Sequence, residues 1–164
     1  MTEHRLNQTA AEVQAIQDGS RTRISTPIDP QPKYDEDSRE WDWRVPGVSA
    51  IWDAGDSSEV VSELICACAP WQVGDLIRLW EQYDELEIVN TSVALRVLDV
   101  RAYLVAETGQ TEALAHGFRS TLDPAWCPKD RPARFAFRDD WTQRHPGHPF
   151  DTAWAWGMGF EVVR

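Results

Sequence analysis

The sequence predicts an α+β fold, a small β-barrel with helices packed on it. The strongest pattern lies at 152–164, where small residues alternate with bulky ones at Trp154, Trp156, Met158, Phe160 and Val162. Side chains alternate across a strand, so one face of this strand is apolar and the other, made of alanines and glycines, is nearly bare. Segments 76–83 and 91–104 carry two further strand patterns, with helix signals before and after them. A bare strand face lets a packed helix or a flat ligand approach the backbone closely.

The N-terminal part contains a helix signal followed by an extended segment. Thr9-Ala-Ala-Glu12 is a capping box, in which the Thr hydroxyl and the Glu carboxylate satisfy backbone donors of the first helical turn. With Gly19 as the stop, this predicts a helix over about 10–18. Residues 21–26 predict a strand, since Thr and Ile favour it and Pro27 disfavours helix before it.

Residues 33–66 predict a surface insertion within a single domain that spans residues 1–164. The prolines at 27, 30 and 32 form an extended linker that leads into it. Segment 41–52 has the pattern of a hairpin around a Pro-Gly turn, and 59–65 predicts one more strand. The acidic start and the Gly-Asp-Ser-Ser loop favour exposure to solvent.

The C-terminal half has the clearest elements. A Gly-Asp turn at 74–75 begins the strand at 76–83, and the long strand at 91–104 follows. A short helix is expected over 111–116, where Gly117 ends it. A second helix is expected over 132–145, because apolar residues recur at four-residue spacing and proline suits a first turn.

The composition limits the partners. The 164 residues carry a net charge of −11, which argues against charge-driven binding to duplex nucleic acid. A local basic pocket is compatible with that charge, because acidity elsewhere repels non-cognate polyanions. Nine tryptophans suggest that some rings serve a recognition surface. With an odd count of three cysteines, a polar start and no long apolar run, we expect a cytoplasmic protein with reduced thiols and no membrane span.

Two polar features are candidates for a site. Glu81 continues the apolar face of its strand, so it is either solvated at a frayed strand end or in need of a partner. Arg21, Thr22 and Arg23 follow the first helix, and arginine forks suit phosphates and carboxylates. An internal ion pair between Arg21 and Glu81 is the structural alternative.

No metal and no cofactor are predicted. The possible ligands, Cys66, Cys68, Cys127, His116, His145 and His148, match no compact Cys/His spacing. A Cys–His nucleophile pair has no local signature, and phosphate-binding glycine loops are absent.

Several segments, in order, resemble the ASCH family of the PUA-like superfamily, in the form common in phages and prophages. Residues 18–27 with Pro30-Gln-Pro32 resemble its entry motif, and 71–75 with 79–83 resemble its "Y-x-x-G-D-x-L-W-V-R-E-T-W" segment. Further matches are Val97-Leu-Asp-Val-Arg101 to "V-T-D-V-R", Glu112 to Gly117 to "E-D-A-x-A-E-G", 137–141 to "F-x-x-L-W", and 154–161 to the closing motif.

The resemblance implies a PUA-like barrel whose cleft binds RNA or nucleotides. Small members hydrolyse acetylated cytidine, and the positions that match their catalytic Lys, Thr and Glu are Arg21, Ile24 and His116. None of the three is retained, since arginine keeps its proton and Ile24 has no hydroxyl. A helix C-terminus favours protonated histidine, which would make His116 a poor base. We therefore predict no catalytic residues.

The prediction is a cleft that binds a nucleotide or single-stranded nucleic acid, RNA above all, without catalysis. Arg21, Thr22 and Arg23 would contact phosphate or a base edge, Glu81 would accept from an exocyclic amine, and Tyr83 would stack. Arg21 and Glu81 are expected to face one cleft. One alternative is a hydrolase of a modified nucleoside with His116 or Glu81 as base. The other is an acidic phage-type protein whose residues 35–63 dock on a host protein.

Overall fold

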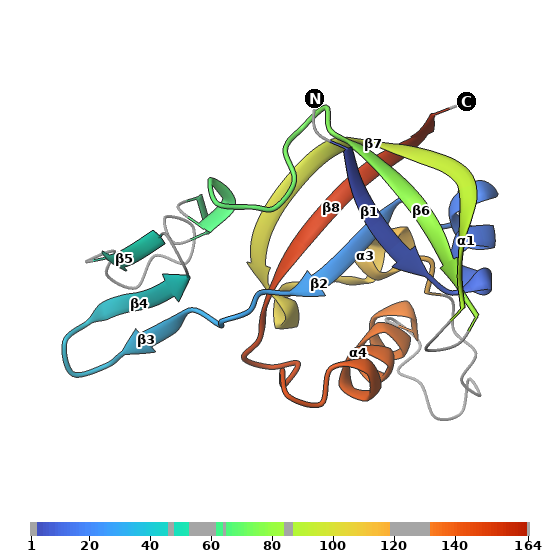
Figure 1. The fold of residues 1–164 in the computed structure, drawn as a ribbon. Helices are drawn as coiled ribbons and strands as arrows, with labels where there is room; N and C mark the ends of the chain where they lie inside the picture. Colours follow the sequence, from blue (N-terminus) through green and yellow to red (C-terminus); the bar gives the residue numbers. More distant parts are fainter. Residues whose placement is uncertain are drawn as a thin grey trace.

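A curved five-stranded sheet forms a half-barrel at the centre of the computed structural model, which describes residues 3–45, 48–52, 62–63, 65–83, 87–118 and 132–163 (Figure 1). Its strand order is β1-β6-β7-β8-β2. The strands are β1 (Glu3–Gln8), β2 (Arg23–Pro27), β6 (Leu76–Gln82), β7 (Ile88–Leu104) and β8 (Trp154–Val163). β1 pairs with β6 in parallel, and the other pairs are antiparallel. The predicted α+β class is confirmed.

Strand β1 is an element that the sequence pattern did not predict. Its residues Glu-His-Arg-Leu-Asn-Gln contain a single apolar side chain, Leu6, so no alternation marks a strand. Leu6 packs against the core, and the backbone pairs along β6 from Glu3 opposite Leu76 to Gln8 opposite Glu81. Tertiary pairing therefore determines this strand, where local propensity does not.

The helices agree with the predicted ranges to within about one residue. α1 (Ala10–Gln17) has the predicted capping box between Thr9 and Glu12. α3 (Gln110–Ala115) follows the short 3₁₀ helix η1 (Val105–Glu107), and α4 (Pro132–Arg144) buries Phe137 and Trp141. α3 packs against α4. None of the described helices is long and apolar enough to cross a membrane.

A second sheet, β3-β4-β5, projects beside the half-barrel (Figure 1). It consists of β3 (Lys33–Asp35), β4 (Glu40–Val45) and β5 (Val48–Trp52), so the hairpin predicted at 41–52 is confirmed. The strand predicted at 59–65 is wrong where the structure describes it, because residues 62–63 and 65–66 are helical. A short apolar run does not distinguish helix from strand. Residues 59–61 and 64 lie outside the described residues, and acidic docking by 35–63 stays a prediction.

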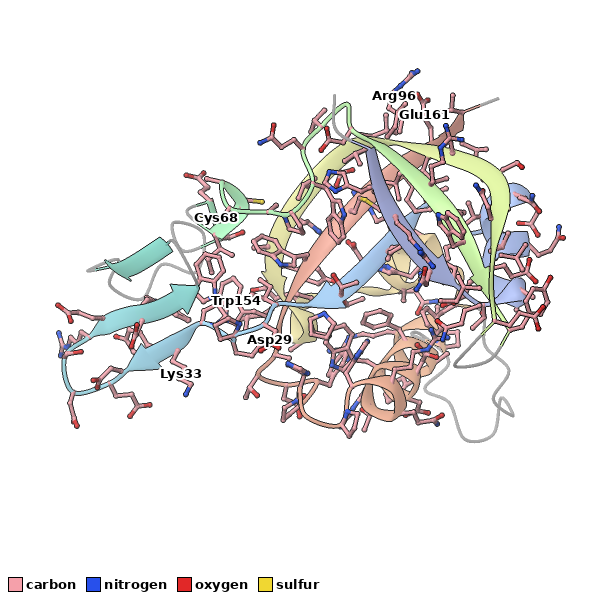
Figure 2. All side chains as sticks on the ribbon, viewed as in Figure 1. Asp29, Lys33, Cys68, Arg96, Trp154 and Glu161 are labelled. Carbon is pink, nitrogen blue, oxygen red and sulfur yellow. The ribbon has the colours of Figure 1, made fainter. Side chains whose placement is uncertain are left out.

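The core lies along β8. The exposed fractions of Trp154 and Trp156 are 2% and 8%, which confirms the predicted burial of this strand's bulky face. Their rings meet Trp41 and Trp43 edge-on, with centroids 5.5 and 6.2 Å apart, and thereby join the second sheet to the first. Figure 2 shows Trp154 at this junction, near Asp29 at the start of the linker to β3.

An exposed ion pair links β7 and β8 near the C-terminal end of β8. Arg96 lies opposite Glu161, and their side chains meet at 2.9 Å between Nη1 and Oε1 (Figure 2). A shift in register follows between Val97 and Asp99. A β-bulge bends a strand and changes the direction of its side chains. After this bulge, polar side chains of β7 lie across β8.

Candidate functional site

The small-residue face of β8 accommodates polar side chains from its neighbour β7. Asp99 lies opposite Gly159, and Arg101 opposite Gly157. A Cβ on Gly157 would lie 2.9 Å from a ring carbon of Tyr103, and one on Gly159 would overlap the carboxylate of Asp99. Both positions therefore require glycine, because the side chains of β7 lie directly over the backbone of β8 there. The packed helix that the sequence suggested accounts for the alanines of this face, since Ala153 and Ala155 belong to one buried cluster with Ala113 of α3 and Phe137 of α4. The glycines instead make room for side chains of β7.

These side chains reach β2 and α3, where they form an ion network. Arg23 binds Asp99 through both terminal nitrogens, with Nη1 3.0 Å from Oδ1 and Nη2 3.0 Å from Oδ2. Glu112, in the first turn of α3, pairs with Arg101 and lies 3.7 Å from Arg23 Nη1. Such bidentate pairs hold a guanidinium in a defined orientation. Arg23 is therefore engaged by carboxylates.

A second network surrounds Glu12 of α1. Arg21 Nη1 and Arg144 Nη1 each lie 2.7 Å from Oε1 of Glu12. Burial by itself would raise the pKa of Glu12, but the hydrogen bond and charge of Arg21, the Thr9 backbone and Arg144 lower it to about 2. Arg21 thus pairs with Glu12 rather than with Glu81, the partner that the sequence suggested.

The third group is a hydrogen-bonded chain of Tyr103, Ser25 and His116. Ser25 Oγ lies 2.7 Å from the Tyr103 hydroxyl and 2.6 Å from His116 Nε2. His116 Nδ1 lies 2.9 Å from the backbone carbonyl oxygen of Glu112. A carbonyl oxygen only accepts, so this contact places the proton on Nδ1 and leaves Nε2 to accept from the Ser25 hydroxyl.

His116 is neutral at physiological pH in this environment. Its burial opposes the charged form and lowers its pKa to about 4, which outweighs the hydrogen bond to the Glu112 carbonyl and the Glu112 charge. The expectation that the helix end keeps this imidazole protonated is therefore wrong, because desolvation dominates over the dipole. Burial also raises the pKa of Tyr103, which keeps its phenol protonated.

Of these groups, the Glu12 network and the Ser25–His116 pair line a cavity of about 130 Å³ next to a wider hollow of about 460 Å³. Arg21, Ser25 and His116 line the cavity together with the aromatic rings of Phe118, Phe137, Trp141 and His145. Tyr83 lines the hollow. Gln8, Glu12 and Arg144 line both, so the two spaces adjoin.

The predicted site residues are distributed over this region. Arg21 lies in the cavity and Tyr83 is 60% exposed in the hollow. Glu81 is half-buried on β6 beside Gln8, and its hydrogen bond raises the pKa of Tyr83. Thr22 is exposed, and its backbone bonds Ala115 and Phe160. That Arg21 and Glu81 face one cleft stays a prediction.

Sequence reasoning missed Ser25, Tyr103 and Glu112. The signal for Ser25 was present, because residues 21, 23 and 25 share one face if the segment is a strand, whereas Ile24 points into the core and is 2% exposed. No local pattern indicates Tyr103 or Glu112. Tyr103 reaches the site because its side chain lies over the glycines of β8, and Glu112 because of where α3 lies.

Metal ligation has no support in the described part of the chain, where no three His, Cys, Asp or Glu side chains group suitably. Cys66 and Cys68 are free thiols. Cys127 lies outside the described residues.

We expect Gly157→Ala to lower the free energy of unfolding by about 1–3 kcal/mol, because its methyl would displace the Tyr103 ring and Arg101. Gly147→Ala is the control, since a Cβ there meets nothing within 4 Å. Urea denaturation of both variants measures the difference. Equal stability of the two variants would show that the side chains of Tyr103 and Arg101 do not lie against the backbone of residue 157.

Comparison with known proteins identifies the fold. No family model matches the chain, and neither does any curated protein. The crystal structure of an ASCH domain from Lactobacillus crispatus JV V101 superposes with a TM-score of 0.51 at 12% identity, covering 98% of this chain and 79% of that one. A crystal structure of a hypothetical protein covers 99% of this chain and 100% of its own, with a TM-score of 0.43 and 10% identity. The chain has the fold of an ASCH domain, a half-barrel with helices, as the resemblance implied.

Proposed function

We propose that the protein binds the base of a nucleotide, or of a short single-stranded nucleic acid such as RNA, in the cavity beside α3 and α4. The observation that carries the proposal is the set of aromatic rings around that small cavity, with Arg21 on its wall. Aromatic side chains stack on any base, and each such contact contributes about 1–3 kcal/mol. The ASCH-type fold is compatible with this function.

The charges of the site favour recognition of a base over recognition of a phosphate chain. In the cavity wall, Arg21 and Arg144 are balanced by Glu12 and Asp140. Beside it, Arg23 and Arg101 are balanced by Asp99 and Glu112. A paired guanidinium offers its remaining N–H groups to a base edge but adds little net positive potential. Few counterions would be released on binding, so the salt dependence of the affinity should be shallow.

The exposed residues near the hollow extend the proposed contact beyond one base. Tyr83 offers a ring to a second base, and Glu81, hydrogen-bonded to it, can accept from an exocyclic amine. Arg21 supplies donors at the cavity. Thr22, in the segment that connects α1 to β2, has an exposed side chain with a hydroxyl group. Arg23 acts by holding Asp99 and Glu112 in place.

Titration calorimetry with nucleoside monophosphates and short single-stranded RNA and DNA tests the proposal. We expect Tyr83→Ala to weaken oligonucleotide binding about 5- to 30-fold, the loss of one stacked base, with less effect on a mononucleotide. Val73→Ala is the matched control, because Val73 is 69% exposed at the other end of β6. Equal affinities of the two variants, or no binding of any nucleotide at millimolar concentration, would contradict it.

A further inference from the structure

Three exposed arginines, Arg5, Arg78 and Arg96, lie on neighbouring strands of the outer face of the half-barrel, and we call them the outer arginines. Arg5 of β1 lies opposite Arg78 of β6, and Arg96 of β7 lies opposite Leu76, two residues before Arg78. Residues that pair across a sheet share one face, so the three side chains lie on the same side of the sheet. The alternate residues of β6 are buried in the core on the other side.

This arrangement concentrates positive charge on one face of a chain whose net charge is −11. Like charges directly opposite one another on neighbouring strands repel, and Arg5 and Arg78 stand in that relation. Arg5 Cζ lies 4.2 Å from the centre of the Trp80 ring, and this cation–π contact fixes the position of the guanidinium. Arg96 pairs with Glu161, but the two side chains are 49% and 48% exposed (Figure 2), and such an ion pair is weak. An anionic partner would relieve the repulsion.

The outer arginines adjoin the proposed nucleotide site through Asn7. The side-chain oxygen of Asn7 accepts a hydrogen bond from Arg5 Nε at 3.1 Å. Asn7 also lines the hollow, together with Tyr83. A strand of nucleic acid with one base in the cavity and a second base on Tyr83 would therefore continue past Asn7 onto the outer arginines.

We propose that the outer arginines bind the phosphates of a single-stranded nucleic acid that extends from the cavity and the hollow. The inference rests on the proposed function and adds a second contact surface to it. Guanidinium groups bind phosphate oxygens through paired N–H donors, and proteins bind single strands by combining positive charge with aromatic rings on which bases stack. An unpaired base is required, because the cavity of about 130 Å³ does not admit a base pair.

The proposal predicts that the salt dependence of the affinity grows with the length of the oligonucleotide. A mononucleotide occupies the cavity, where Glu12 engages both Arg21 and Arg144, so its salt dependence should be shallow. An oligomer of about eight nucleotides reaches the outer arginines as well. Each phosphate contact of a single strand makes the slope of log K against log salt concentration steeper by about 0.7, so three contacts should add about 2.

The test measures binding of labelled oligouridylate and oligothymidylate to the full-length protein by fluorescence anisotropy at several salt concentrations. A triple variant with Arg5→Gln, Arg78→Gln and Arg96→Gln should bind the octanucleotide with a slope that is shallower by about 2. Replacing the same three residues by lysine keeps the charges and should keep the slope, which separates loss of charge from loss of folding. Arg39→Gln is the control, because Arg39 is exposed in the turn between β3 and β4, outside this sheet.

Two results would overturn the proposal: an octanucleotide that binds the wild type no more tightly than a mononucleotide does, or equal salt slopes for the wild type and the glutamine variant. Binding of a mononucleotide alongside either result would leave the cavity as the nucleotide site. Octanucleotide binding that depends on the outer arginines, without binding of any mononucleotide, would support this face and contradict the cavity. Binding of polyglutamate to the outer arginines in place of the oligonucleotide would identify an acidic protein as the partner and would also overturn the proposal. If the glutamine variant fails to fold, the wild-type length series and the lysine variant decide.

Discussion

Replacing Trp156 by alanine is expected to lower the free energy of unfolding by about 3–5 kcal/mol, the cost of emptying a large site in a packed core. Trp156 is 8% exposed and lies on β8 between Thr26 of β2 and Ala102 of β7. Its ring meets Trp43 of the second sheet, so the truncation also loosens the junction of the two sheets.

Urea denaturation, followed by circular dichroism, measures this loss. Leu98→Ala serves as the control, because Leu98 is 49% exposed on β7 and should change stability by less than about 0.5 kcal/mol. A Trp156→Ala variant as stable as Leu98→Ala would refute the packing of β8.

The second large effect is a loss of stability on acidification, caused by His116. The unfolded chain binds a proton on this residue below its ordinary pKa of 6.5, whereas burial lowers the folded pKa to about 4. Because the folded pKa is depressed, the stability is fully present above pH 6.5 and falls as the pH drops to about 4. The shift corresponds to about 3 kcal/mol over that window.

Free energies of unfolding at intervals from pH 7 to pH 4 would reveal this effect. His116→Gln should give a flatter profile, since glutamine has no proton to gain. His145, whose pKa burial also lowers, contributes in the same direction, and His145→Gln measures its share. The carboxylate of Glu12, with its pKa near 2, adds a loss only below about pH 4.5. Parallel profiles for wild type and His116→Gln would show that the imidazole is not buried and neutral.

Several elements follow from neighbouring residues alone. The capping box Thr9–Glu12 predicts the start of α1, and the alternation at 154–162 predicts β8 and its buried face. These are local signals, because a cap needs only the first turn of the helix and a strand face needs only a period of two. The resemblance of several separate motifs to ASCH domains predicted the barrel-like fold, and the superposition on an ASCH domain confirms that fold.

The tertiary structure decided what the local signals left open. The sequence of β1 is too polar to predict a strand, and β1 forms because it pairs with the edge of β6. Residues 62–63 and 65–66 are helical, although their pattern fits either element. The candidate site follows the same rule. Ser25 meets His116 because the end of α3 lies beside the start of β2, where Thr22 N donates to the Ala115 carbonyl oxygen, and Tyr103 reaches them only across the glycines of β8. The neutral imidazole is likewise a consequence of burial, since the free energy of desolvation depends on the groups that surround a side chain and not on its neighbours in sequence.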